Sequence, residues 1–140
     1  MTIKEVCERY GISADTLRYY ERTGVIPPVG RTGGGIRDYT EQDISWVENA
    51  ICMRGAGLSV ETLAEYVRLF QEGDGTIPAR RALLAGARED LAAQLEKCRE
   101  TLERLDYKIS RYDEAMKTGV LTWDAPEERG AAMERNEGVG

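Results

Sequence analysis

The chain has 140 residues, of which 41% are hydrophobic and 31% are charged, a composition typical of one or two small soluble domains. It contains no histidine, which excludes Ser-His-Asp and Cys-His catalysis, and no run of about 18 apolar residues of the kind that spans a membrane. Three scattered cysteines favour a reducing cytoplasm, and no spacing of metal ligands or nucleotide-binding motif indicates a metal or a cofactor.

The net charge of −6 conceals one basic segment. Residues 16–37 carry four arginines and a single acid, Glu21. Electrostatic binding to DNA depends on where the positive charge lies rather than on the sum, so an acidic chain can still present a basic surface. This segment is therefore the candidate for contact with phosphate groups.

The N-terminal residues have the pattern of a helix-turn-helix. Apolar side chains recur at helical spacing over residues 3–10, and Gly11 suits the left-handed cap that ends such a helix. Ser13 is a good N-cap for a second helix, which we expect to end near residues 23–24. In a helix-turn-helix the second helix enters the major groove of DNA. The pattern thus predicts a DNA-binding regulator.

Residues 25–39 predict a small β-hairpin, or wing. Two short β-prone pieces flank a glycine-rich tip that includes Gly34 and Gly35. A flexible linker is the alternative. We favour the wing because Arg31 and Arg37 flank the tip on both sides.

Two further helices complete the first domain, residues 1–73. Thr40 begins a capping-box-like sequence ahead of a helix over residues 41–54. Ser59 caps a fourth helix, which stops at residues 72–73. Together with the first two helices they predict a small four-helix core.

Residues 74–118 predict a long dimerisation helix. From residue 84 the apolar positions alternate at spacings of four and three, as in a coiled-coil seam, with Arg88 as the plainly polar member. Nothing else in the chain covers so narrow a stripe, so a second copy is the simplest partner. One antiparallel register pairs Leu95 with Leu105 of the partner subunit. The predicted interface comprises Leu84, Leu91, Leu95, Cys98, Leu102, Leu105, Ile109, Tyr112 and Met116.

Residues 119–140 predict a short C-terminal tail. The stretch from Val120 to Trp123 is apolar enough to pack as a flap. Residues 125–140 are polar, net acidic and glycine-containing, so we expect them to be disordered.

Two segments carry a resemblance to a known family. Residues 16–28, TLRYYERTGVIPP, and residues 34–39, GGIRDY, resemble the winged helix-turn-helix of the MerR family in order and in spacing. The pattern extends over residues 1–72, and the long helix after it resembles the family's dimerisation coil. The resemblance implies a mainly α fold, with a winged helix-turn-helix domain of four short helices and a small β-wing, followed by a long antiparallel coiled-coil helix.

The resemblance implies a homodimeric bacterial transcription regulator. Members of the family bind double-stranded promoter DNA at a pseudo-palindromic site, then distort and untwist the promoter spacer for RNA polymerase. For one of the adjacent residues Tyr19 and Tyr20, the alternative to a contact with DNA is a position in the hydrophobic core. By position, Ser13, Thr16, Arg18 and Tyr19 lie on or at the start of the recognition helix, Tyr20, Arg31, Arg37 and Tyr39 mainly hold phosphates, and Gly34 and Gly35 belong to the wing.

Cys52 is the candidate sensor. Residues 51–59, together with residues 35–39 and 72–74, are similar to the aldehyde-responsive AdhR/NmlR-like branch of the family. In that branch one cysteine on this helix is proposed to be alkylated by reactive carbonyls. A thiolate is the strongest nucleophile that the chain offers. The alternative is a regulator that responds to a small ligand or a partner, with Cys52 as a structural residue. We expect Cys7 to pack in the core and Cys98 at the dimer seam.

Other classes of function fit the residues less well. Carboxylates are plentiful, but none form a recognisable catalytic pair and histidine is absent, so we do not expect an enzyme. A coiled-coil adaptor that kept a degenerate DNA-binding fold is the remaining alternative. Salt-dependent binding to promoter DNA would distinguish a regulator from such an adaptor.

Overall fold

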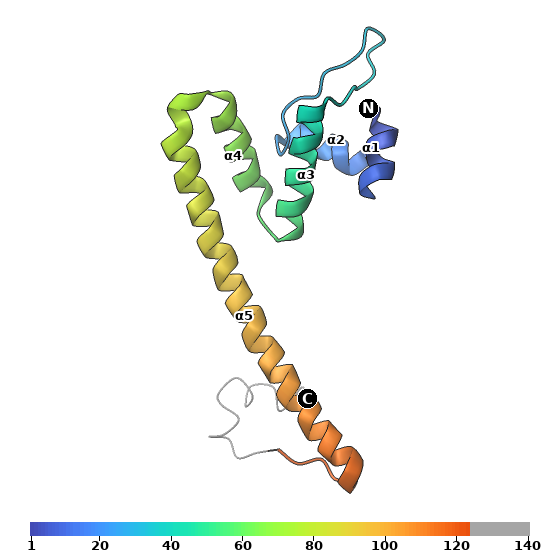
Figure 1. Ribbon diagram of the computed structural model, residues 1–140, viewed down its shortest axis with the longest axis vertical. Coiled ribbons are helices and arrows are strands. Elements are labelled where there is room, and N and C mark those ends of the chain that lie inside the picture. Colours follow the sequence, from blue (N-terminus) through green and yellow to red (C-terminus); the bar gives the residue numbers. More distant parts are fainter. Residues whose placement is uncertain (124–140) are drawn as a thin grey trace. The chain divides into compact units, whose positions relative to one another are not determined.

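The computed structural model describes residues 1–123 and is built from helices (Figure 1). The chain divides into two compact units, with the boundary between Leu91 and Ala92. The predicted disorder of residues 125–140 falls outside the described part. The elements are α1 (Ile3–Tyr10), α2 (Ala14–Thr23), α3 (Glu41–Gly55), α4 (Val60–Gln71), the short 3-10 helix η1 (Asp74–Thr76) and α5 (Ile77–Thr118).

Side-chain caps fix where the helices of the first unit begin. The Thr2 hydroxyl accepts a hydrogen bond from the Glu5 backbone N–H, and the Glu5 carboxylate accepts one from the Thr2 N–H. Thr40 and Asp43 form the same reciprocal capping box at the start of α3. Ser13 caps α2 by accepting from a backbone N–H of its first turn. Because caps act locally, the predicted helix boundaries are confirmed to within about one residue.

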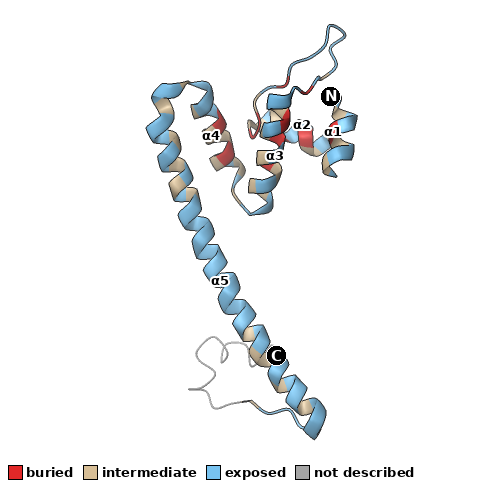
Figure 2. Ribbon diagram, viewed as in Figure 1, coloured by how far each residue is buried: buried red, intermediate tan, exposed pale blue. Residues whose placement is uncertain are grey.

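A single core joins α1, α2, α3, α4 and the segment between α2 and α3. Val6 of α1, Leu17 of α2 and Val47 of α3 have no exposed surface. Figure 2 marks buried residues on these helices, whereas α5 carries none. The cluster of buried residues is Val6, Leu17, Tyr20, Val25, Ile26, Val29, Tyr39, Ile44, Val47, Ala50 and Leu63.

The wing is a loop rather than a β-hairpin. One antiparallel bridge joins Arg31 to Arg37, and residues 1–123 contain no β-strand. At the tip, the Thr32 N–H donates to the Ile36 carbonyl at 2.7 Å, and Gly35 takes a left-handed conformation with φ 80°. Consecutive glycines weaken strand pairing because they have no side chains to pack and lose much entropy on ordering. The predicted wing is therefore present, but the β-structure expected for it is reduced to this bridge.

The helix α5 has 42 residues, and none of them is buried. At about 1.5 Å per residue it is roughly 60 Å long. The large apolar side chains of the predicted seam range in exposed fraction from 37% at Leu91 to 84% at Met116. In a single copy the seam is therefore an uncovered apolar stripe.

The chain reverses direction after α5. Gly119, with φ 81°, makes the turn, and the Trp123 ring stacks on the Tyr107 ring with 6.0 Å between centroids. The Arg111 Nε donates to the Thr122 carbonyl at 2.8 Å, which ties the returning segment to the helix. The apolar segment that follows α5 thus packs back on the last turns of its own helix.

Candidate nucleic-acid interface

The recognition helix α2 has one buried and one exposed face. Leu17 and Tyr20 point into the core, with exposed fractions of 0% and 8%. Ser13 and Arg18 lie on the exposed side, as does Tyr19, which is 39% exposed. The spacing of buried residues by three leaves the opposite face free to approach DNA. Of the predicted recognition-helix residues, Ser13, Arg18 and Tyr19 are therefore exposed, and Thr16 is half-buried.

Arg18 and Tyr19 are a charged and an aromatic side chain on the exposed side of α2. Arg18 makes an ion pair with Asp15 at 3.2 Å, in which the Asp15 side chain is 96% exposed. Such surface pairs contribute little to stability, so the guanidinium can exchange this partner for a phosphate or a base edge. The Arg22 guanidinium lies 5.4 Å from the centroid of the Tyr19 ring. The Arg22 cation thus lies over the exposed Tyr19 ring.

At the N-terminus of α2, hydroxyl groups accompany the free backbone N–H groups. Ser13 Oγ accepts from the Thr16 N–H at 3.0 Å, and the two hydroxyl oxygens lie 2.8 Å apart. A helix N-terminus carries partial positive charge, which favours a phosphate group nearby. This geometry suits the predicted placement of Ser13 and Thr16 at the DNA surface.

Tyr20 and Tyr39 belong to the core, although the sequence assigned both to phosphate binding. Tyr20 is 8% exposed and Tyr39 is 2% exposed. The Tyr39 hydroxyl is buried without a hydrogen-bond partner within residues 1–123, and its burial raises the pKa of the phenol. For the adjacent pair, the alternative of one core tyrosine thus falls on Tyr20. Both residues belong to the buried core cluster, and a direct phosphate contact stays a prediction.

The two wing arginines differ in their surroundings. Arg31 is exposed, and its Nη1 donates to the Gly35 carbonyl at 2.8 Å. Arg37 is only 21% exposed and donates from Nε to Glu21 Oε1 at 2.7 Å. The prediction from the sequence treated the two arginines as equivalent and gave Glu21 no role. The signal that could have identified Glu21 is that it is the single acid in a segment with four arginines.

Cys52 lies exposed on α3. The neighbouring Arg54 donates from Nη1 to the Leu58 carbonyl at 2.7 Å, so its guanidinium binds the segment that follows α3. Cys7 is half-buried against the core, in line with the packing role expected for it, and Cys98 is exposed on α5. Within residues 1–123 no group of three or more cysteine, aspartate or glutamate side chains is arranged to hold a metal ion.

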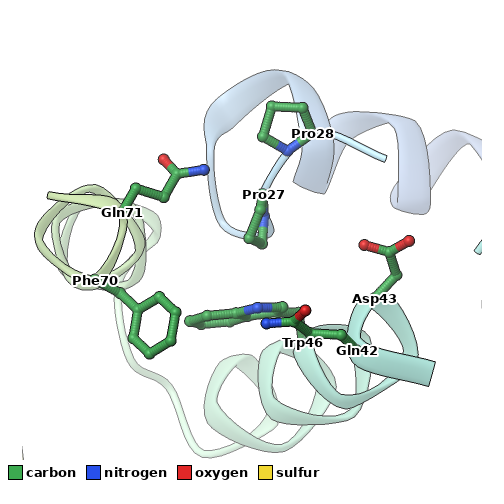
Figure 3. Close-up of a pocket in the computed structure, with 7 residues that line it drawn as sticks. All are labelled: Pro27, Pro28, Gln42, Asp43, Trp46, Phe70 and Gln71. Carbon is green, nitrogen blue, oxygen red and sulfur yellow. The ribbon is translucent and has the colours of Figure 1, made fainter. Parts of the chain in front are cut away.

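A groove of about 420 Å³ lies between the prolines that follow α2 and the helices α3 and α4. Figure 3 shows the Trp46 indole below Pro27, with Phe70 at one end and Asp43 at the other. The Trp46 and Phe70 rings meet edge to face at 5.1 Å between centroids. This ring contact packs α3 against α4, and the groove beside it is also lined by the prolines of the turn that follows α2.

The comparisons with known proteins place this arrangement in a family. Residues 1–69 match the family model described as MerR HTH family regulatory protein. A crystal structure of a MerR family transcriptional regulator from Listeria monocytogenes is 44% identical, with a TM-score of 0.80, over 85% of this chain and 90% of that one. The chain belongs to the MerR family. Its helix-turn-helix, wing and long helix are those of a MerR transcription regulator.

Two further MerR relatives carry informative names. The HTH-type transcriptional regulator AdhR of Bacillus subtilis is 56% identical over 91 residues, which are 65% of this chain and 65% of AdhR. HiNmlR, described as a MerR family regulator lacking the sensor domain and bound to promoter DNA, is 31% identical with a TM-score of 0.77. That match covers 86% of this chain and 95% of HiNmlR. Both names belong to the branch that the sequence resembles, and both denote regulators rather than enzymes.

None of the helices within residues 1–123 combines the length and the apolar content of a membrane-spanning segment.

Proposed function

We propose that this MerR protein binds a pseudo-palindromic promoter site as a homodimer in the bacterial cytoplasm and activates transcription by distorting the promoter spacer. The exposed face of α2, with Ser13, Arg18 and Tyr19 beside the arginine-bearing wing, carries the proposal. The DNA-bound state of the relative HiNmlR, at 31% identity, supports it.

Dimerisation is proposed from the exposed seam of α5. Burying an apolar stripe of this kind stabilises a protein by roughly 25 cal/mol per Å² of apolar surface. A second α5 offers the same stripe, and the 4-3 spacing is the one that interdigitates in a coiled coil. Two copies in antiparallel register, with Leu95 against Leu105 of the partner subunit, would place the recognition helices at opposite ends of the coil. A symmetric reader of this kind fits half-sites that lie one or more DNA turns apart.

Activation is proposed to act through the shape of the DNA. Bending or untwisting a promoter spacer costs several kcal/mol, and contacts at two half-sites can offset that cost. RNA polymerase is the partner that gains from the change, because the spacing between its two promoter elements is then corrected. We therefore propose that two copies of this chain distort the promoter DNA together.

Cys52 is proposed as the aldehyde-responsive group. Its exposed thiol on α3 is accessible to a small carbonyl compound. The thiolate sulfur attacks the carbonyl carbon, an S–C bond forms, and the C=O π electrons move to the oxygen, which takes a proton from water. A core cysteine would require burial, which Cys52 lacks in a single copy. The second candidate is a regulator that responds to a small ligand or a partner protein, with Cys52 in a structural role.

Footprinting on the DNA upstream of the chain's own gene tests these proposals together. We expect two protected regions related by a pseudo-dyad, with cleavage of the central bases enhanced by formaldehyde or methylglyoxal. Cys52→Ala should keep the protected regions and lose the response to aldehyde, whereas the control Ser45→Ala, at an exposed position of the same helix, should keep both. Absence of any protected site would contradict the regulator, and a full aldehyde response in Cys52→Ala would exclude Cys52 as the sensor.

A further inference from the structure

A single carboxylate connects the recognition helix to both limbs of the wing. Glu21, near the end of α2, is 16% exposed. Its Oε1 accepts from Arg37 Nε at 2.7 Å, and its Oε2 accepts from the Val29 backbone N–H at 3.3 Å. Val29 lies on the limb that enters the wing and Arg37 on the limb that leaves it. One side chain of α2 therefore holds the base of the wing on both sides.

Because of the contact with Glu21, the two wing arginines have different bonding partners. Arg31 and Arg37 face each other across the one antiparallel bridge of the wing, so they occupy equivalent places in the backbone. The Arg37 side chain is largely buried and forms an ion pair with Glu21. Arg31 is exposed and, among residues 1–123, bonds to the Gly35 carbonyl without an ion pair. A guanidinium that makes one hydrogen bond to a carbonyl has further donors for a phosphate.

We propose that Glu21 is a positioning residue for DNA binding. It fixes the wing against the recognition helix and neutralises Arg37, which leaves Arg31 as the wing cation that binds phosphate. This assignment removes Arg37 from the phosphate-binding set that the sequence suggests. It rests on the proposed DNA binding, and the test below separates the failure of one from the failure of the other.

The salt dependence of DNA binding distinguishes a phosphate-binding arginine from a neutralised one. Each phosphate contact contributes about −0.9 to the slope of log affinity against log salt, so a residue present twice in a dimer contributes about −1.8. Over a roughly fourfold rise in salt concentration, a variant without these two contacts should therefore lose about twelvefold less affinity than the wild type. A residue that only holds the wing changes the affinity without changing this slope.

The test measures binding of the full chain to random-sequence DNA and to the DNA upstream of its own gene across a salt series. Arg31→Gln should flatten the slope by about 1.8 per dimer, whereas Arg37→Gln should leave the slope unchanged and weaken binding to the upstream DNA. Glu21→Gln keeps an acceptor for the Val29 N–H but frees Arg37 from its ion pair. We expect this variant to show a steeper slope on random DNA and a smaller preference for the upstream DNA.

Three outcomes would overturn the inference. If Arg37→Gln flattens the slope as much as Arg31→Gln, Arg37 itself binds phosphate. If Arg37→Gln fails to fold, judged by circular dichroism, Glu21→Gln decides instead, and an unchanged slope in that variant contradicts the neutralising role of Glu21. If the wild-type chain shows no salt-dependent DNA binding at all, the proposed function fails and the inference fails with it.

Discussion

The DNA-binding domain and the long helix are stabilised by different means. Residues of α1–α4 and the wing share one core, in which Leu17 and Val47 are fully buried. The helix α5 has no buried residue along its 42 positions. Long helices in water gain most of their stability from packing an apolar face, and the apolar face of α5 is uncovered. The first region therefore buries its apolar residues within a single copy, whereas the seam of α5 would be buried only in the proposed dimer.

The largest expected effect separates the core from the seam. Leu17→Ala removes a fully buried side chain and should destabilise the first domain by about 2–5 kcal/mol at any protein concentration. The matched variant Leu102→Ala changes a seam residue that is 59% exposed in one copy. Its effect should appear as weaker association, so its unfolding midpoint should depend on protein concentration. Urea unfolding at several protein concentrations measures both effects. A loss of stability in Leu102→Ala that does not depend on protein concentration would contradict this difference between the core and the seam.

A second prediction separates DNA contact from dimer contact. Arg18→Ala removes one exposed guanidinium of α2 and should weaken binding to the operator by about 1–3 kcal/mol per half-site, while the dimer stays intact. Arg99→Ala removes an exposed arginine of α5 and serves as the control. Gel-shift titration and light scattering report the two properties. Normal operator affinity in Arg18→Ala would refute its place in the interface.

Two glycines should respond in opposite directions to substitution by alanine. Gly86 lies within α5 with open space around its Cβ position, so Gly86→Ala should stabilise the helix by about 1 kcal/mol. Gly24 ends α2 with φ 84°, and Gly24→Ala should cost about 1–2 kcal/mol because a side chain is strained in that conformation. Thermal unfolding compares them. A stabilising Gly24→Ala would show that the cap of α2 is not held as described.

The smallest expected effect concerns Tyr39 at alkaline pH. Burial raises the pKa of this phenol above its unfolded value of about 10, so the neutral form favours the folded state. Its contribution is complete below that unfolded pKa and is lost as the pH rises through the higher, folded value. Tyr39→Phe removes a hydroxyl without a described partner and should be nearly neutral at pH 7. Stability measured across alkaline pH should fall less in Tyr39→Phe, and equal losses would contradict this cause.

The features that the sequence predicted well are local ones. Caps such as Ser13 and Thr40 act within one turn, and the boundaries of α1–α4 could therefore be read directly from the residues. The features that it missed depend on contacts between distant residues. Glu21 and Arg37 are 16 positions apart, and only the folded chain brings their side chains within 2.7 Å. The burial of Tyr39 likewise follows from tertiary packing, which residue type alone does not determine.

The proposed homodimer depends on the antiparallel pairing of two α5 helices, and disulfide cross-linking tests this pairing directly. The measurement uses a chain whose three native cysteines are replaced by alanine, with Leu95→Cys and Leu105→Cys introduced singly and together. An antiparallel dimer should become covalent under mild oxidation only when both changes are present, because Leu95 then faces Leu105 of the partner subunit. Efficient cross-linking of Leu95→Cys alone would indicate a parallel dimer, and no cross-linking in any variant would contradict the proposed coiled coil.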